Sequence, residues 1–227
     1  LNILTQQEIK TFDVDQTRWL LFIVLGELIY SLDLKNNVPS NAITSNPFFT
    51  EITGIAADWI NEKIYWTTGG NLMMASYDGT GVYPLHSLRQ PIGDVVVHPG
   101  LEKIFWIENG LIYSTNLDGN DLATFISSQT GNPEKLHIDY TLERLYWTDS
   151  TKNTVEYVNL DGTDRQSYSY SEKPYGLAAF GDRVFWTTPE GLHWTYKDTG
   201  VDTKVEPTIP GLRDVKVYWE TSFPDFD

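Results

Sequence analysis

The sequence predicts an all-β fold, a β-propeller of five four-stranded antiparallel blades. Three observations predict it: a repeated aromatic pair, short apolar runs of strand length, and turn signals between these runs. Successive pairs lie 40, 41 and 39 residues apart, which is the length of a four-stranded blade. The pairs are Tyr65-Trp66, Phe105-Trp106, Tyr146-Trp147 and Phe185-Trp186.

Each repeat begins with a short apolar stretch that we predict to be the inner strand of a blade. Small and β-branched residues suit a strand that is covered on both faces and crowded near a central axis. The aromatic strand follows, and because its large side chains recur at the same repeat position, we predict packing between blades rather than a ligand-binding stripe. The inner strands are residues 54–59, 94–99, 135–140 and 176–180, and the aromatic strands are residues 64–68, 104–108, 145–149 and 184–188.

A third strand in each repeat leads into an Asp-Gly dipeptide or a variant of it. Asp and Gly tolerate a positive φ, so each dipeptide predicts a hairpin turn into the outermost strand. The turns are Asp78-Gly79, Asp118-Gly119, Asp161-Gly162 and the variant Asp198-Thr199-Gly200.

The N-terminal stretch supplies a fifth repeat, in which residues 18–24 take the place of the aromatic strand and residues 27–34 that of the third strand. Two segments compete for its inner strand, residues 10–15 and residues 213–219. We predict that residues 213–219 pair beside residues 18–24 and close the ring, so that residues 1–227 form one domain without an open sheet edge. In the alternative, residues 213–219 begin a sixth blade.

Charge and composition exclude several classes of function. With 31 Asp and Glu against 16 Lys and Arg, the net charge is −15, which opposes binding to nucleic acid and favours a basic partner. The longest apolar run has seven residues, far short of the roughly 20 that span a bilayer, so we expect no membrane insertion. The absence of cysteine excludes disulfides and cysteine-ligated zinc.

We find no candidate for catalysis and predict that the chain is not an enzyme and holds no metal or cofactor. The four histidines are scattered without metal-ligand spacing, and no nucleophile motif is present. His98 occupies the repeat position that Asp58 and Asp139 hold elsewhere, and we interpret it as a hydrogen-bonding residue of a bottom loop. A calcium-assisted hydrolase like the six-bladed lactonases is the enzymatic alternative, and it would draw on those two aspartates.

Several segments resemble the YWTD propeller of the low-density lipoprotein receptor family (class B repeats), which is also found in nidogen and related extracellular proteins. They are Tyr146-Trp147-Thr148-Asp149, VNLDGTDRQ at residues 158–166, WLLFIVLGELIYSLDL at residues 19–34, and LRDVKVYW at residues 212–219. The resemblance runs from about Thr11 to about Trp219. It implies a secreted, extracellular, non-enzymatic domain, although five repeats are counted here against six in the family, in a stand-alone chain without cysteine.

The family resemblance also implies that partners dock on the top face, where the loops that leave the aromatic strands meet those that begin the inner strands. Specificity is expected at top-face positions that differ between blades. These positions suit a protein or peptide ligand, basic and with an apolar anchor. A small-ligand carrier that uses the central channel, or an oligomer-forming module, are alternatives. The predicted binding residues are Glu51, Thr68, Arg89, Glu108, Asn109, Asp149, Lys152, Tyr175, Glu190 and Arg213.

Overall fold

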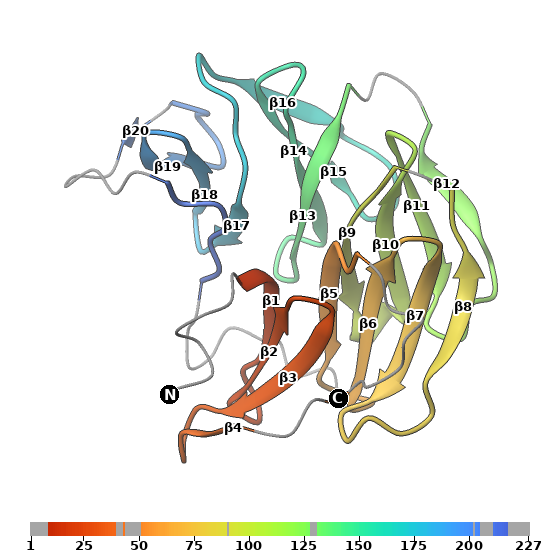
Figure 1. Cartoon of the computed structure of the whole chain (residues 1–227). Coiled ribbons are helices and arrows are strands. Elements are labelled where there is room, and N and C mark those ends of the chain that lie inside the picture. The colour runs from red at the N-terminus through yellow and green to blue at the C-terminus, as the bar shows by residue number, and fades with distance from the viewer. Residues whose placement is uncertain are drawn as a thin grey trace. The chain divides into compact units, whose positions relative to one another are not determined.

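The structure is a computed structural model that describes residues 9–39, 43, 51–89, 91–127, 131–201, 203–204 and 211–217. Its strands form five separate four-stranded sheets, and within each sheet the strands are hydrogen-bonded in chain order (Figure 1). Neighbouring strands are antiparallel, as in the pairs β1–β2 and β14–β15. The predicted fold class, a β-propeller with five four-stranded antiparallel blades, is confirmed.

The strand bounds follow the predicted repeats. The first blade holds β1 (Ile9–Asp15), β2 (Leu20–Leu25), β3 (Leu28–Asp33) and β4 (Val38–Pro39). The second holds β5 (Gly54–Asp58), β6 (Lys63–Thr68), β7 (Asn71–Ser76) and β8 (Tyr83–Ser87). The third holds β9 (Ile92–His98), the 3-10 helix η1 (Pro99–Leu101), β10 (Lys103–Glu108), β11 (Leu111–Asn116) and β12 (Ala123–Ile126). The fourth holds β13 (Pro133–Asp139), β14 (Arg144–Asp149), β15 (Thr154–Asn159) and β16 (Gln166–Ser169). The fifth holds β17 (Leu177–Phe180), β18 (Arg183–Thr188), β19 (Gly191–Tyr196) and β20 (Thr203–Lys204).

The aromatic pair lies on the second strand of its blade and forms the core. The four repeated tryptophans are 0–1% exposed. Packing, rather than a ligand-binding stripe, is therefore confirmed as the role of these rings. In the second blade, for example, Trp66 packs in one cluster with Ile55 of the inner strand and Met73 of the third strand.

The Asp-Gly dipeptides form the predicted turns. Gly79 has φ +82° and Gly162 has φ +85°, in the region that favours glycine. The preceding aspartate stabilises each turn, since Asp78 Oδ1 accepts hydrogen bonds from the backbone N–H of Thr80 at 2.9 Å and from its hydroxyl at 2.7 Å. Local sequence alone specifies this connection because all its partners lie within two residues.

The structure corrects the prediction for the first blade. β1 pairs with β2 in the register Asp15↔Leu20 to Ile9↔Leu25, and β3 pairs with the other edge of β2. A strand has two hydrogen-bonding edges, so residues 213–219 cannot pair beside residues 18–24, and that prediction is wrong. The competing segment, residues 10–15, is the inner strand.

Residues 211–217 instead lie against the start of the fifth blade. A Cβ at Gly176 would come within 2.5 Å of Asp214 Cα and 2.8 Å of Val215 N. Gly54, at the start of the second blade, has the same relation to the next inner strand, because its Cβ would lie 2.8 Å from Asp94 Cα and 2.7 Å from Val95 N. The backbone at Asp214 thus follows the fifth blade as β9 follows the second. Residues 218 and 219 lie outside the described residues.

The chain divides into two compact units, residues 1–124 with 220–227, and residues 125–219. We describe each unit by itself, and a single domain over residues 1–227 stays a prediction. Within the second unit, a buried ion pair joins the fourth and fifth blades. The Lys197 ammonium donates to the Asp139 carboxylate and, at 2.7 Å, to the carbonyl of Gly181. Both side chains are less than a tenth exposed.

We expect Lys197→Met to lower the free energy of unfolding by about 3–5 kcal/mol, because it leaves the Asp139 carboxylate buried without its cation. Urea denaturation followed by tryptophan fluorescence measures this change. Lys103→Met is the matched control, since the side chains of the Lys103–Asp121 pair are 31% and 69% exposed and its loss should cost less than about 1 kcal/mol. Equal losses in the two variants would contradict the prediction.

The position of residues 214–215 is tested by Gly176→Ala. The added methyl group would collide with backbone rather than with a flexible side chain, so we expect a loss of about 1–3 kcal/mol in the free energy of unfolding. Gly70→Ala serves as the control because a Cβ there meets nothing within 4 Å. If both variants unfold at the same urea concentration as the parent chain, the segment does not lie against Gly176.

Candidate functional site

The bottom turns use their polar side chains to hold the backbone. Asp58 Oδ1 accepts from the backbone N–H of Ile60 and of Asn61, both at 3.0 Å. Asp139 Oδ1 accepts from Thr141 and Leu142 in the same way. His98 Nδ1 accepts from Leu101 N at 3.1 Å, which confirms it as a hydrogen-bonding residue of a bottom loop.

These bonds bear on the hydrolase alternative. The carboxylates of Asp58 and Asp139, on which it would draw, accept backbone donors in the turns, and Asp139 is also paired with Lys197. Within the part of the chain that the structure describes, no group of three or more His, Asp or Glu side chains could hold a metal ion. Both aspartates therefore stabilise the turns in which they lie.

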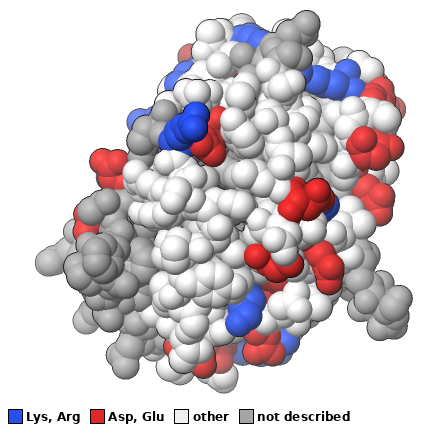
Figure 2. Space-filling view, turned by 90° about the vertical axis from the view of Figure 1, so that its right-hand side faces the viewer, with Lys and Arg blue, Asp and Glu red and all other residues white. Residues whose placement is uncertain are grey.

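Acidic side chains are distributed over the surface in several groups separated by uncharged residues, as Figure 2 shows for one face. The net charge of −15 therefore does not by itself mark a binding site. A site must instead be identified from carboxylates whose geometry differs from that of their neighbours.

Glu108 is such a carboxylate, at the top end of β10 in the third blade. The residue is 9% exposed. Its Oε1 accepts from the backbone N–H of Arg89 at 2.8 Å, and its Oε2 from the indole N–H of Trp106 at 3.3 Å. Asn109 continues the loop at φ 51° and donates its N–H to Pro91 O at 2.7 Å. The structure thus brings together three predicted binding residues, Arg89, Glu108 and Asn109.

A cavity of about 300 Å³ opens beside Glu108, between the last strand of the second blade and the third blade. The Trp106 ring stacks with two other rings, that of His86 at 5.9 Å and that of Tyr113 at 5.7 Å between centroids. His86 and Tyr113 are partly exposed, whereas Trp106 is 1% exposed and forms the floor. The lining residues are His86, Ser87, Leu88, Arg89, Trp106, Glu108, Tyr113 and Leu122. We call this space the Glu108 cavity.

The charge of Glu108 is not balanced by an ion pair with any residue in the described part of the chain. Among the described residues, no Lys, Arg or His side chain forms an ion pair with it. Two other buried carboxylates do have such a partner, since Asp139 has Lys197 and Asp15 has Arg18. A carboxylate removed from water gains most from a cation, so the Glu108 cavity favours a positively charged group.

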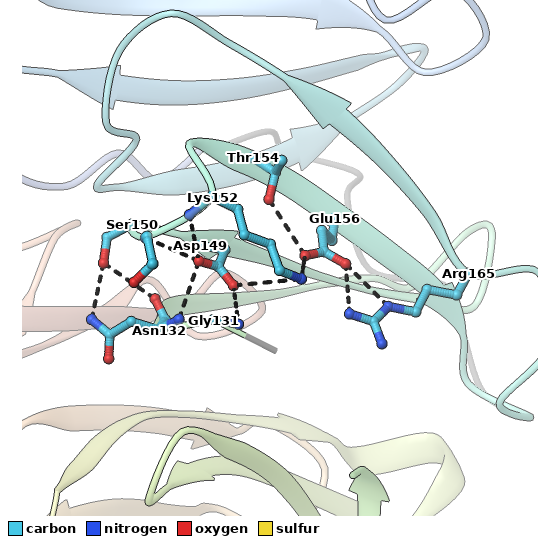
Figure 3. A network of polar contacts seen from close by, with 9 residues as sticks. Gly131, Asn132, Asp149, Ser150, Lys152, Thr154, Glu156 and Arg165 are labelled. Carbon is cyan, nitrogen blue, oxygen red and sulfur yellow. Dashed lines mark hydrogen bonds and ion pairs between the residues drawn. The ribbon is translucent and has the colours of Figure 1, made fainter. Parts of the chain in front are cut away.

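Asp149 occupies the equivalent end of β14 in the fourth blade but serves the fold (Figure 3). It is 0% exposed, and it accepts backbone hydrogen bonds from Gly131 at 2.6 Å, Asn132 at 3.1 Å, and Thr151 and Lys152 at 3.0 Å each. Burial raises the pKa of Asp149, but these N–H donors outweigh burial and leave the pKa below its usual range.

Lys152 belongs to the same network. Its ammonium donates to Glu156 Oε1 at 2.9 Å, and the guanidinium of Arg165 binds Glu156 Oε2 at 2.7 and 3.0 Å (Figure 3). The guanidinium also lies over the Trp147 ring, 5.1 Å from its centroid. The charge of Glu156 is therefore satisfied within the blade.

Two cations lie over the ring of Tyr175 near the start of the fifth blade. The ammonium of Lys173 is 5.1 Å and the guanidinium carbon of Arg213 is 5.2 Å from its ring centroid. Lys173 also pairs with Glu134 at 2.8 Å. The structure thus joins two predicted residues, Tyr175 and Arg213, in one cation–π cluster.

The remaining predicted residues differ in accessibility. Glu51 and Glu190 are exposed, whereas Thr68 is 2% exposed and cannot present its side chain to a partner. The sequence did not single out His86, Leu88, Tyr113 or Leu122 as site residues. A period of two along β10 puts Trp106 and Glu108 on one face, but nothing local in the sequence indicates which residues of the second blade meet them.

Across the described residues, no helix has the length and apolar character that a membrane crossing requires.

Several known proteins are similar in sequence to most of the chain. No family model matches the chain. A vitellogenin receptor of Solenopsis invicta is 31% identical over 164 residues, which are 68% of this chain and 9% of that protein. A human low-density lipoprotein receptor-related protein 5-like protein is 25% identical, over 72% of this chain and 70% of its own length. The protein cueball of Drosophila simulans is 28% identical, over 77% of this chain and 32% of its own length.

A solved structure has the same fold. A chain in the crystal structure of a nidogen/laminin complex matches 87% of this chain and 79% of its own length, with a TM-score of 0.80 and 19% identity. The fold rests on this structural match, and the family relationship rests on the relatives found by sequence. This chain spans about a tenth of the vitellogenin receptor and about a third of cueball.

The pKa of Asp149 predicts a pH dependence of stability. A carboxylate whose folded pKa lies below its unfolded value stabilises the fold above about pH 4, and this contribution is lost as the pH falls through the folded pKa. We expect Asp149→Asn to remove that dependence and to flatten the fall of stability below about pH 4. The variant should also lose about 1–3 kcal/mol at pH 7, because the amide NH₂ faces backbone donors.

Urea denaturation over this pH range measures both effects. Asp182→Asn is the control, since its carboxylate is largely exposed. A variant at Asp149 that keeps the parent's acid sensitivity would show that another group is responsible.

Proposed function

Because the chain is a YWTD-repeat β-propeller of the low-density lipoprotein receptor family, we propose that it is an extracellular, non-enzymatic domain that binds a basic protein or peptide through its top-face loops. One relative is named a receptor and another a receptor-related protein, and the solved neighbour belongs to a complex between two proteins. Both support a protein ligand.

The observation that carries the proposal is the Glu108 cavity. It places a buried carboxylate, without a cationic partner among the described residues, at a top-face end of the third blade. We infer a basic ligand from this carboxylate. Burial removes water from the charged group, and a cation of the ligand would compensate for that loss. The net charge of −15 acts in the same direction at long range, by accelerating the approach of a basic molecule.

The proposed contact surface includes most of the predicted residues. Thr68 and Asp149 are left out because their side chains are buried, and the carboxylate of Asp149 is occupied by backbone donors. The contact residues are Glu51, Arg89, Glu108, Asn109, Lys152, Tyr175, Glu190 and Arg213. Aromatic and arginine residues such as Tyr175 and Arg213 are enriched at protein interfaces, which suits this assignment.

Peptide binding tests the proposal. The probes are fluorescein-labelled 12-residue peptides of equal apolar content that carry a net charge of about +4, 0 or −4, and fluorescence polarisation measures their affinity. We expect the basic peptides to bind at least tenfold more tightly than the neutral and acidic ones at about 50 mM salt. This preference should shrink severalfold at about 300 mM salt, because screening weakens the attraction between exposed charges.

Glu108→Gln should weaken the basic peptides about three- to tenfold, which corresponds to about 0.7–1.4 kcal/mol. Glu102→Gln, which removes one exposed charge at the bottom of the same blade, should leave the affinity unchanged. Equal affinity for basic, neutral and acidic peptides, or an equal effect of the two substitutions, would refute a basic ligand at this surface.

A further inference from the structure

We propose that the Glu108 cavity is an arginine-binding site, which holds the guanidinium of one arginine side chain of the basic partner against the rings of the cavity and the carboxylate of Glu108. This inference rests on the proposed function and narrows the partner's chemistry. The evidence comes from the Glu108 cavity and from the fourth and fifth blades, where other side chains cover the tryptophan equivalent to Trp106.

The fifth blade shows what fills this space elsewhere. Trp186 occupies the repeat position of Trp106, and each pairs across to a ring on the third strand, His193 or Tyr113. On Trp186, however, the ring of Tyr170 from the end of the fourth blade stacks at 4.1 Å between centroids. In the third blade the nearest such ring, His86, is 5.9 Å from Trp106.

The strand register identifies which residue of the second blade is equivalent to Tyr170. Tyr170 donates its backbone N–H to Asn153 O at 2.9 Å, directly after Ser169 pairs with Thr154. Leu88 donates its N–H to Gly70 O at 2.8 Å, directly after Ser87 pairs with Asn71. Leu88 is therefore the equivalent of Tyr170. A leucine in place of the tyrosine ring leaves the space that the Glu108 cavity occupies.

The fourth blade shows which group suits such a position. There the guanidinium of Arg165 lies over the ring of Trp147, the equivalent of Trp106, and binds the Glu156 carboxylate through two nitrogen atoms. An aromatic surface and a buried carboxylate thus already hold a guanidinium in this chain. The Glu108 cavity presents the same two components, aromatic rings and a carboxylate, and no described Lys, Arg or His side chain forms an ion pair with that carboxylate.

The shape of the cavity favours arginine over lysine. A planar guanidinium stacks on aromatic rings and meets a carboxylate with two parallel N–H groups, whereas an ammonium acts as a compact point charge. A volume of about 300 Å³ is at the lower end of the range for ligand pockets, which suits one side chain rather than a whole small molecule.

The chain's own Arg89 does not fill this role. It contributes its backbone N–H to Glu108 Oε1, while the residue as a whole is exposed and its guanidinium forms no ion pair with Glu108. Arg89 therefore lies at the rim.

The indole N–H resonance of Trp106 reports on the site, because this group donates to Glu108. The probe is N-acetyl-arginine methylamide, added to the ¹⁵N-labelled full chain and followed by ¹H–¹⁵N correlation spectra, with Trp106→Phe to assign the resonance. We expect a saturable shift with a dissociation constant on the order of 1 mM. The lysine analogue should bind at least threefold more weakly, and the uncharged citrulline analogue at least tenfold more weakly.

Two variants probe different parts of the cavity. Glu108→Gln should weaken the arginine analogue at least tenfold, which is about 1.4 kcal/mol. Leu88→Tyr reproduces the closed arrangement of the fifth blade and should abolish the shift while Glu108 stays in place. Glu102→Gln is the matched charge control and should bind as the parent chain does. Thermal melting shows that each variant is folded, and if one is not, the other still tests the site.

Equal binding of the arginine, lysine and citrulline analogues would overturn the inference, as would unchanged binding by a folded Leu88→Tyr variant. The two proposals fail separately. If basic peptides bind with the expected salt dependence but the arginine analogue leaves Trp106 unshifted, the arginine-binding site is wrong and the basic ligand stands. If neutral and acidic peptides bind as tightly as basic ones, the proposed function is wrong, whatever the arginine analogue does.

Discussion

The burial of one tryptophan in each of the last four repeats is the constraint on which the rest of the structure depends. Trp66, Trp106, Trp147 and Trp186 lie on second strands that are hydrogen-bonded on both edges, and none is more than 1% exposed. A single four-stranded sheet cannot cover such a ring on both faces, so each blade needs neighbouring side chains from outside its own sheet. The repeat of about 40 residues is the chain's means of supplying them.

What covers each tryptophan differs from blade to blade, and these differences give the repeats separate properties. Trp186 carries a tyrosine ring from the preceding blade, Trp147 carries an arginine paired with a glutamate, and Trp106 lies below a cavity. The strand pairing hardly changes among the three. Function can therefore vary through single side chains at the blade junctions while the burial that stabilises the fold is kept.

The carboxylates at the ends of the second strands show the same principle. Glu108 and Asp149 hold equivalent positions, each paired with the first residue of the third strand. The shorter Asp149 accepts four backbone donors and fixes the loops around it, whereas Glu108 accepts one backbone and one indole donor and lines a cavity. One extra methylene and a different preceding loop thus separate a side chain that stabilises the fold from one available to a ligand.

The sequence by itself determined the repeat period, the strands, the Asp-Gly turns, the bottom-loop role of His98, and the positions of Arg89 and Glu108 at strand ends. These features depend on residues a few positions apart, so local patterns specify them. Only the tertiary structure decided which segment is the inner strand of the first blade, because residues 10–15 and 213–219 share one pattern and differ only in which edge they reach. It also decided that Asp149 is buried and that Leu88, His86 and Tyr113 surround one cavity, since contacts between blades join residues that no sequence period relates.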